Sequence, residues 1–386
     1  FANPRLNKAY DALQAWKAVV FSDPYNFTLN WEGPDVCSYN GVFCAEALDD
    51  PNITVVAGVD LNHGDIAGNL PDEIGNLTDI SLLHLNSNRF CGLIPHTIRK
   101  LSLLFEIDVS NNRFVGRFPS VLLELPELAY LDLRFNNFEG ALPPELFDKK
   151  LDAIFLNSNR FCSTIPENFG NSPASVVVMS HNKLTGCLPK SIGNMAGKLD
   201  ELVVSHNYLS GCLPEEITLL NTTTVLDISR NKLVGDLPRG MEYMQGMEIF
   251  NIRGNNFRSK VPESVCTLPS LENFTFSYNY FDAMDEACYP HAVPEVSVDD
   301  QMNCFAGANK QRSEAECSEA QKKSVDCSGA CRSGSDGEAP KETPDNSEKE
   351  DKAPPPPAVS PPIGTPSKSE KDAPPPVYSP PPPAIS

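Results

Sequence analysis

A sixteen-residue pattern recurs along most of the chain and constrains its fold more than any other feature. ISLLHLNSNRFCGLIP begins at residue 80, and LFEIDVSNNRFVGRFP, LAYLDLRFNNFEGALP and LDAIFLNSNRFCSTIP follow it. The ninth position is an asparagine that returns every 23 to 25 residues, at Asn88, Asn112, Asn136, Asn159, Asn182, Asn207, Asn231, Asn255 and Asn279. One repeat cannot bury its own leucines. The repeats must therefore stack into a continuous core, with a strand from each in a parallel sheet.

The pattern has the form LxxLxLxxNxFxGxIP, which is that of a leucine-rich repeat. Gly64 takes the asparagine position in an earlier, atypical repeat at residues 56–71, so about ten repeats are predicted. We expect each asparagine to point inward, where its amide can satisfy backbone groups of the adjacent turn. The predicted fold is therefore α/β, a horseshoe-shaped leucine-rich repeat solenoid at residues 56–288.

The two ends of a solenoid expose its core and need caps. Residues 1–55 are predicted to form the first cap, because they place five apolar side chains on one helical face: Leu6, Tyr10, Leu13, Trp16 and Val20. Residues 289–331 are predicted to form a cysteine-rich C-terminal cap or hinge, with Cys304, Cys317, Cys327 and Cys331 close together. We expect two disulfides from these four residues, and a zinc site is the alternative.

The other cysteines suggest further bridges. Cys187 and Cys212 occupy the same position in consecutive repeats. Neighbouring strands are close enough for a disulfide to join these two residues, so a bridge is predicted. Two unpaired thiols are the alternative. Cys266 and Cys288 flank the last repeat and could clamp it. Cys91 and Cys162 share a position but lie three repeats apart, so each is predicted to be a free thiol or to bridge two chains across a two-fold axis.

Twelve cysteines together with glycosylation sequons predict a secreted protein. The sequon asparagines are Asn26, Asn52, Asn76, Asn221 and Asn273. The chain starts at Phe1 without an apolar leader, so we expect a signal peptide to have been removed. No membrane span is expected, because no apolar stretch reaches about 18 residues.

The chain is strongly acidic, with 51 Asp and Glu against 31 Lys and Arg and a net charge of -20. This balance disfavours nucleic acid, anionic lipid and acidic polysaccharides as direct partners and favours a basic one. The sequence has no HExxH motif, no GxSxG elbow and no phosphate-binding glycine loop. A non-enzymatic binding protein without cofactor or metal is therefore predicted.

Recognition in such a fold belongs to the exposed positions around each strand, which point away from the core on the concave sheet. In the second to fifth repeats these are His84, Asn86, Glu106, Asp108, Tyr130, Asp132, Arg134, Phe135 and Phe155. Aromatic anchors beside carboxylates suit a basic partner, and a merely solvated acidic sheet is the alternative. His181 and His206 lie one repeat apart and could respond to pH or be inert.

Residues 332–386 are polar and then rich in proline, so they are predicted to be disordered. Near the end, VYSPPPP resembles the repeat unit of extensins, the hydroxyproline-rich proteins of plant cell walls. In extensins such prolines are hydroxylated and glycosylated, and the tyrosines crosslink. The resemblance implies wall anchoring through Tyr378, Ser379, Pro380, Pro381, Pro382 and Pro383. A protein-binding polyproline linker is the alternative.

The order of plant-type repeats, cysteine-dense hinge and extensin-like tail resembles the leucine-rich repeat extensins of plants. The segment around Cys37 and Cys44 is similar to the plant N-terminal cap, in which a cysteine pair of this spacing is bridged. The single full SPPPP unit is fewer than is usual in that family.

Membership of this family would imply a secreted, dimeric protein of the plant cell wall, or apoplast. Its members bind basic, cysteine-rich rapid alkalinization factor peptides, which would link peptide capture to wall integrity and growth. Two alternatives remain. One is an inhibitor of pectin-degrading enzymes, like the polygalacturonase-inhibiting proteins, and the other is a purely structural wall protein.

Overall fold

The computed structural model describes residues 1–289, 296–325 and 327, which belong to one compact unit formed by residues 1–335. Cys331 and the predicted wall-anchoring residues Tyr378 and Ser379 to Pro383 lie outside the described residues. Among the described helices, none is long and apolar enough to cross a membrane.

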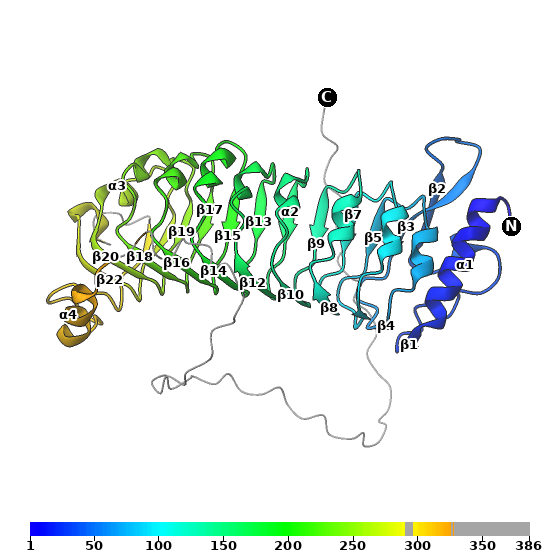
Figure 1. The fold of residues 1–386 in the computed structure, drawn as a ribbon, viewed down its shortest axis with the longest axis horizontal. Helices are drawn as coiled ribbons and strands as arrows, with labels where there is room; N and C mark the ends of the chain where they lie inside the picture. Colours follow the sequence, from blue (N-terminus) through cyan, green and yellow to red (C-terminus); the bar gives the residue numbers. More distant parts are fainter. Residues whose placement is uncertain (290–295, 326, 328–386) are drawn as a thin grey trace, which may run out of the picture. The chain divides into compact units, whose positions relative to one another are not determined.

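A sheet of 12 described strands, which we call the long sheet, runs through the whole repeat array (Figure 1). Its strands in spatial order are β2 (Val42–Glu46), β3 (Thr54–Asp60), β5 (Leu82–His84), β7 (Glu106–Asp108), β9 (Tyr130–Asp132), β11 (Ala153–Phe155), β13 (Val176–Val178), β15 (Glu201–Val203), β17 (Val225–Asp227), β19 (Ile249–Asn251), β21 (Asn273–Thr275) and β23 (Ser297–Asp299). All pairs are parallel except β2 with β3. Strands β3 to β21 correspond to the ten predicted repeats, and the leucine-rich repeat solenoid is confirmed. Strand β23 lies beyond the predicted end at residue 288.

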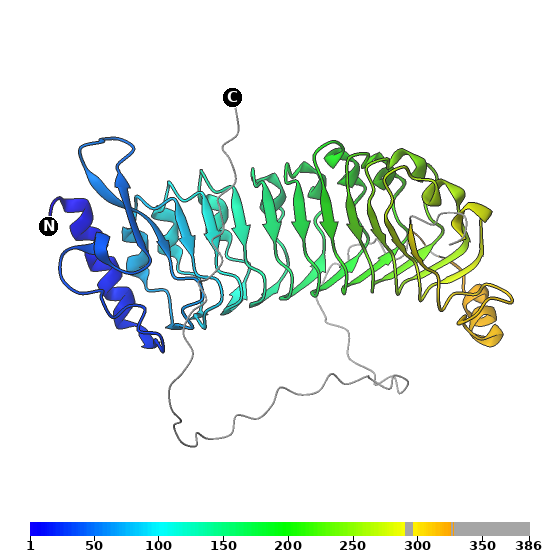
Figure 2. The same cartoon turned by 180° about the vertical axis from the view of Figure 1, so that it is seen from behind.

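A second sheet of nine described strands begins after the turn that follows the long-sheet strand of each repeat and runs along the lower edge of the array (Figure 2). It contains β6 (Cys91–Gly92), β8 (Arg113–Arg117), β10 (Asn137–Gly140), β12 (Arg160–Thr164), β14 (Lys183–Gly186), β16 (Tyr208–Gly211), β18 (Lys232–Gly235), β20 (Asn256–Val261) and β22 (Tyr280–Met284). These strands come from the NxFxG segments. Separately, β1 (Val20–Ser22) pairs antiparallel with β4 (Ala67–Gly68).

Helices occupy many of the connections between strands. The α-helices are α1 (Pro4–Ala18), α2 (Glu145–Asp148), α3 (Glu263–Cys266) and α4 (Glu314–Lys322). The 3-10 helices are η1 (Val36–Ser38), η2 (Asp72–Asn76), η3 (His96–Lys100), η4 (Ser120–Glu124), η5 (Phe169–Asn171), η6 (Lys190–Met195), η7 (Glu215–Leu219), η8 (Met241–Tyr243) and η9 (Glu286–Cys288). Helices η3 to η9, α2 and α3 lie between second-sheet and long-sheet strands, and η2 lies between β4 and β5, whereas α1 and η1 belong to the N-terminal cap and α4 follows β23. Helix α1 begins after Asn3, whose side chain accepts hydrogen bonds from the backbone N–H groups of Arg5 and Leu6. As predicted, α1 buries Leu6, Leu13 and Trp16, whereas Tyr10 is half-buried and Val20 lies beyond the end of the helix, on β1.

The repeat asparagines join the two sheets, which confirms their predicted inward direction. The Nδ2 of Asn136 donates to the carbonyls of Val109 and Leu133 at 2.9 and 3.2 Å, where the chain leaves the long sheet. Its Oδ1 accepts from the N–H of Phe114 in the second sheet at 3.0 Å. Asn303 makes equivalent bonds to Phe276 and Phe281 and extends this ladder beyond the predicted repeats.

The core between the sheets is filled by leucines and by a stack of phenylalanines. The rings of Phe114, Phe138 and Phe161 follow one another at 6.4 and 6.3 Å between centroids and are close to parallel. At the N-terminal end, Trp16 of the cap lies 5.9 Å from Phe90. Cap and repeats therefore share a single hydrophobic core.

Four disulfides have both partners among the described residues: Cys37–Cys44, Cys212–Cys327, Cys266–Cys288 and Cys304–Cys317. Since Cys212 bonds Cys327, the predicted bridge between Cys187 and Cys212 is wrong. The prediction of two disulfides within the C-terminal group of four cysteines is wrong as well, because Cys304 bonds Cys317 but Cys327 pairs outside the group. Cys187 is itself disulfide-bonded, so the alternative of two thiols is also wrong. Strand spacing permitted the predicted bridge, but the segment after α4 returns to the second sheet and takes Cys212.

The remaining candidate positions lie on the surface of the solenoid. Cys91 on β6 and Cys162 on β12 are free thiols in this single chain, half-buried and exposed respectively. Among the sequon asparagines, Asn26, Asn52 and Asn221 are exposed, whereas Asn76 and Asn273 are half-exposed. Asn273 begins β21 and thus lies on the long sheet.

Candidate functional site

Parallel, in-register pairing places the predicted binding residues in two rows across the long sheet. His84, Asp108, Asp132 and Phe155 are successive partners on β5, β7, β9 and β11. Glu106 and Tyr130 are partners in the second row. The middle residue of each strand is fully buried, so the two flanking residues of each strand point toward the outer face. The structure thus brings together most of the residues that the sequence singled out.

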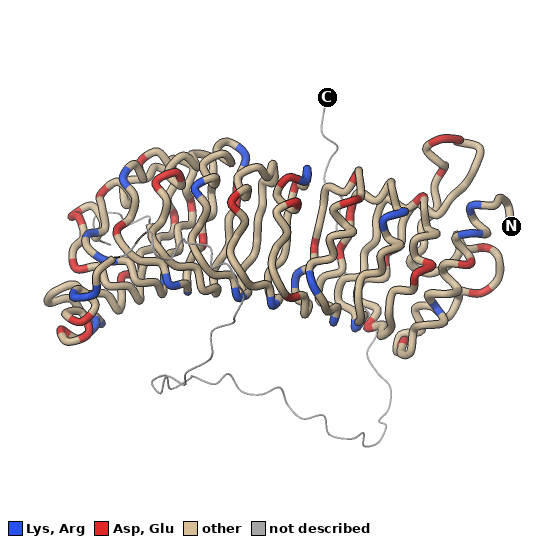
Figure 3. The backbone as a smooth tube through the Cα atoms, in the orientation of Figure 1, with Lys and Arg blue, Asp and Glu red and all other residues tan. Residues whose placement is uncertain are grey.

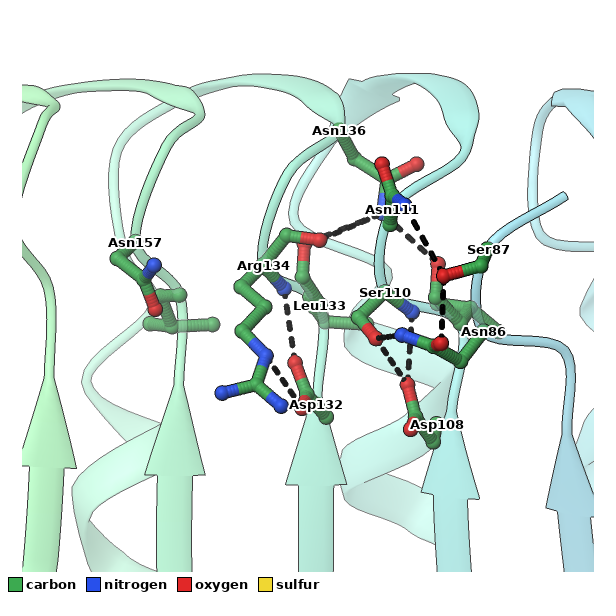
Figure 4. A network of polar contacts seen from close by, with 12 residues as sticks. Asn86, Ser87, Asp108, Ser110, Asn111, Asp132, Leu133, Arg134, Asn136 and Asn157 are labelled. Atoms are coloured by element: carbon green, nitrogen blue, oxygen red, sulfur yellow. Dashed lines mark hydrogen bonds and ion pairs between the residues drawn. The ribbon is translucent and has the colours of Figure 1, made fainter. Parts of the chain in front are cut away.

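A chain of hydrogen bonds holds Asp108 in place (Figure 4). Ser87 Oγ donates to Asn86 Oδ1 at 2.7 Å, and Asn86 Nδ2 donates to Ser110 Oγ at 2.6 Å. Ser110 Oγ in turn donates to Asp108 Oδ1 at 2.5 Å, and its backbone N–H donates to the same oxygen at 2.9 Å. The carboxylate is therefore oriented before any ligand arrives.

His84 and Glu106 form a second polar pair on neighbouring strands. Nε2 of His84 lies 3.1 Å from Oε2 of Glu106. The Glu106 side chain keeps 42% of its surface exposed, so its carboxylate remains accessible to a ligand.

Asp132 differs from the other carboxylates because its side chain is fully buried. Oδ1 accepts a hydrogen bond from the N–H of Arg134 at 3.1 Å. The Arg134 Nε lies 3.0 Å from Oδ2, but at an angle that makes no hydrogen bond, so Oδ2 has no donor among the described residues (Figure 4). Burial and the nearby charge of Asp108 raise the pKa of Asp132 to about 7, against the opposing effect of Arg134.

Aromatic rings flank this carboxyl group. The rings of Tyr130 and Phe155 lie 5.7 Å apart, and the guanidinium of Arg134 sits 5.1 Å from the Phe155 ring centre. Burial, followed by the charge of Asp132, raises the pKa of the Tyr130 hydroxyl to about 12. Phe135 does not join the strand rows; it occupies the turn after β9 with a φ of 53° and is 52% exposed.

Sequence reasoning missed three polar residues at this site. Ser87 and Ser110 belong to the hydrogen-bond chain on Asp108, and Asn157 has a buried Oδ1 without a described partner (Figure 4). All three follow a long-sheet strand within a few residues. Reading the polar positions after each strand, as well as those within it, would have found them.

The histidines of the later repeats form a different arrangement. The rings of His181 and His206 are stacked, with centroids 4.0 Å apart. Burial, and then the neighbouring His181, lower the pKa of His206. This pair lies outside the rows of β5 to β11.

The candidate site is a face rather than a cavity. Two hollows among the described residues, of about 270 and 370 Å³, are lined by residues such as Arg5 and Asp79 or Arg239 and Lys260. Neither includes a long-sheet residue from the candidate rows. A flat surface of this kind suits an extended or folded polypeptide better than a small molecule.

The long sheet has charged residues of one sign within its strands, and Arg134 and Arg253, just after β9 and β19, pair with Asp132 and Asp299. Its described strands contain eight carboxylates and no Lys or Arg: Glu46, Asp60, Glu106, Asp108, Asp132, Glu201, Asp227 and Asp299. We call this the acidic face.

Comparison with known proteins identifies the family to which the chain belongs. The family described as leucine rich repeat N-terminal domain matches residues 6–45, and the leucine rich repeat matches residues 127–148. The chain is 62% identical over 345 residues to pollen-specific leucine-rich repeat extensin-like protein 3 of Arabidopsis thaliana, covering 89% of this chain and 47% of the relative. It is 56% identical over 327 residues to leucine-rich repeat extensin-like protein 7 of the same plant, covering 85% of this chain and 75% of the relative. The chain belongs to the leucine-rich repeat extensin family.

This leucine-rich repeat extensin spans about half the length of extensin-like protein 3, which it covers to 47%. Among solved structures it is similar to the plant peptide hormone receptor RGFR1 in complex with RGF2, at 26% identity and a TM-score of 0.61. The likeness covers 64% of this chain and 40% of the receptor chain.

Proposed function

We propose that this leucine-rich repeat extensin binds a basic, cysteine-rich peptide of the rapid alkalinization factor type on its acidic face. The observation that carries the proposal is the row of carboxylates on the long-sheet strands. Glu106 is partly exposed, and Asp108 is held in place by the hydrogen bond from Ser110. Both lie close to the aromatic pair of Tyr130 and Phe155. A ligand with several cations would meet carboxylates on successive strands and aromatic anchors in the same area.

The family and the fold support the same conclusion. Extensin-like relatives give the wall context, and a solved receptor of similar fold holds a peptide hormone. In this proposal the Pro-rich tail fixes the protein in the plant cell wall, so that peptide capture is coupled to wall integrity and growth.

The test is titration calorimetry of the full chain against a folded basic rapid alkalinization factor peptide. Glu106→Gln combined with Asp108→Asn should weaken binding roughly tenfold, because two accessible charges are removed from the contact area. The matched control is Glu73→Gln with Asp72→Asn, which removes the same two charges from exposed positions on η2.

Three outcomes are informative. A loss confined to the Glu106 and Asp108 pair supports the acidic face as the binding site. An equal loss of affinity in both double variants would show that the loss comes from the overall charge of the protein and that the binding site lies elsewhere. No binding by the unaltered chain would overturn the peptide-binding function and favour an enzyme inhibitor or a structural protein.

A further inference from the structure

The second sheet carries the opposite charge from the acidic face. Its described strands contain seven Lys and Arg residues, namely Arg113, Arg117, Arg160, Lys183, Lys232, Arg258 and Lys260. They contain only two carboxylates, Glu139 and Asp282. In Figure 3, Lys and Arg positions recur along the lower edge of the array, where Figure 1 labels the strands of this sheet.

Many of these cations come from one position of the repeat. The first residues of six consecutive strands, β8 to β18, are Arg113, Asn137, Arg160, Lys183, Tyr208 and Lys232, which we call the cationic row. Neighbours in the row touch: Arg160 Nη2 donates to Asn137 Oδ1 at 2.9 Å, and Lys232 Nζ lies 4.9 Å from the Tyr208 ring centre. The first residue of each strand is in register with the third residue of the strand before it, as Lys183 is with Cys162, so the row runs obliquely across the sheet. One strand spacing of about 4.8 Å and two residues of about 3.3 Å each give roughly 8 Å per step and roughly 40 Å along the row.

The four cations of the row are exposed, and none forms an ion pair with a described residue. Arg89 shows the contrast, because it occupies the same repeat position one unit earlier and pairs with Asp65 at 2.7 Å. Arg160 and Lys183 are the two cations of the row that lie on neighbouring strands, where like charges repel one another and lower stability. Glu139 is the register partner of Arg160 but forms no ion pair with it. A ligand that brings one negative charge to each of several strands would remove that repulsion.

We propose that the cationic row binds a linear acidic polysaccharide that carries a carboxylate on each sugar. Such a chain repeats its charge along its length, so one molecule laid across the strands can meet several cations of the row. An exposed row that crosses six strands suits an extended polymer. The disulfides and sequons place the protein among secreted molecules, which favours a polysaccharide over nucleic acid.

This inference reverses the expectation drawn from net charge. A net charge of -20 disfavours acidic polysaccharides only if the charge is evenly spread. At physiological salt, charges more than about 8 Å apart are largely screened from one another, so a ligand responds to the face that it touches. The second sheet, with seven cations against two carboxylates, presents a locally positive surface.

The experiment measures binding of the full chain to immobilised polygalacturonate by biolayer interferometry. The test variant combines Arg160→Gln, Lys183→Gln and Lys232→Gln. The matched control combines Arg99→Gln, Lys150→Gln and Lys198→Gln, which removes the same three charges from exposed positions outside both sheets. Fully methyl-esterified galacturonan, which has no carboxylates, is the uncharged ligand control.

The unaltered chain should bind polygalacturonate and not its esterified form. The row variant should bind roughly tenfold more weakly, whereas the control triple should stay within about twofold of the unaltered chain. A thermal melt of each variant confirms that it is folded. Equal binding by both triple variants, equal binding to the esterified polymer, or no binding by the unaltered chain would each overturn the proposal. Because peptide binding is measured separately on the other sheet, failure here leaves the proposed function standing.

Discussion

The two sheets of the solenoid are built from the same repeats, yet they carry opposite charge. The three-residue strands β5 to β21 of the long sheet bury their middle residue and turn the first and third toward the outer face. The described long-sheet strands contain eight carboxylates, of which Asp132 is buried, and no cations. From β8 onward, second-sheet strands bury a Phe or Leu in second place and present the first residue, which is often Lys or Arg. The sign of each face is thus set by repeat position, and net charge averages over two surfaces that a partner meets one at a time.

The largest effect is expected from breaking the link between the two sheets. Asn136→Ala removes donors to Val109 and Leu133 and the acceptor of the Phe114 N–H, which leaves buried backbone groups unpaired. The free energy of unfolding should fall by about 3 kcal/mol. Urea titration followed by circular dichroism measures this, with Asn137→Ala as the control, since Asn137 lies next in sequence on the surface of β10. An equal effect of both variants would show that the ladder does not hold the sheets together.

The acidic face should also have a stability cost that depends on pH. Burial raises the pKa of Asp132 to about 7, so its protonated form is favoured in the folded state. A raised carboxyl pKa contributes stability that is present below its unfolded pKa of about 4 and is lost as the pH rises through about 7. Asp108 and Tyr130 face this group together with Arg134.

Asp132→Asn should therefore remove this dependence. Between pH 4 and 7 the unaltered chain should lose on the order of 2 kcal/mol of stability relative to the variant, because partial solvation and Arg134 reduce the full effect. Urea titrations across that range measure the difference, and Asp72→Asn on η2 should follow the unaltered chain. A constant difference between Asp132→Asn and the unaltered chain at all pH values would contradict the raised pKa.

Much of the fold could be predicted because each repeat contains the sequence signals for its own turn and strands. The asparagine marks the turn, the leucines before it mark a long-sheet strand, and the NxFxG segment marks a second-sheet strand. Strand β23 and Asn303 were missed because Asp300 takes the position that Leu85 has in an ordinary repeat. Burial raises the pKa of that carboxyl group, which is consistent with an apolar position occupied by an acid.

Other features depend on contacts that no local pattern contains. The partner of Cys212 is 115 residues away, in a segment without the repeat. The candidate rows could be predicted, because register follows from repeat position. The burial of Asp132 and the hydrogen-bond chain through Ser110 could not be predicted. Both depend on the directions of side chains that follow the strands, namely Arg134 after β9 and Ser110 after β7.

A smaller effect is expected from removing an aromatic side chain of the acidic face, which distinguishes the aromatic from the charged contribution to peptide affinity. Phe155 lies between the Tyr130 ring and the Arg134 guanidinium. Phe155→Ala should weaken binding of the basic peptide roughly tenfold, as expected for an aromatic anchor in the contact area. Tyr243→Ala, at a 62% exposed aromatic residue on η8, is the control for calorimetry. Unchanged affinity in Phe155→Ala would leave the acidic face as a purely electrostatic surface.

The smallest effect concerns whether the two faces act independently. If they do, replacing Arg160, Lys183 and Lys232 by Gln should change the affinity for the peptide less than about twofold. The free-energy effects of substitutions at distant sites add to within about 0.5 kcal/mol, so the two faces should show little coupling. Any residual change should strengthen binding, since removing cations lowers long-range repulsion of a basic peptide, and it should vanish as salt is raised. Calorimetry at two salt concentrations measures this. A several-fold loss of peptide affinity would mean that the peptide also touches the cationic row, and the division of the solenoid into two separate binding surfaces would be wrong.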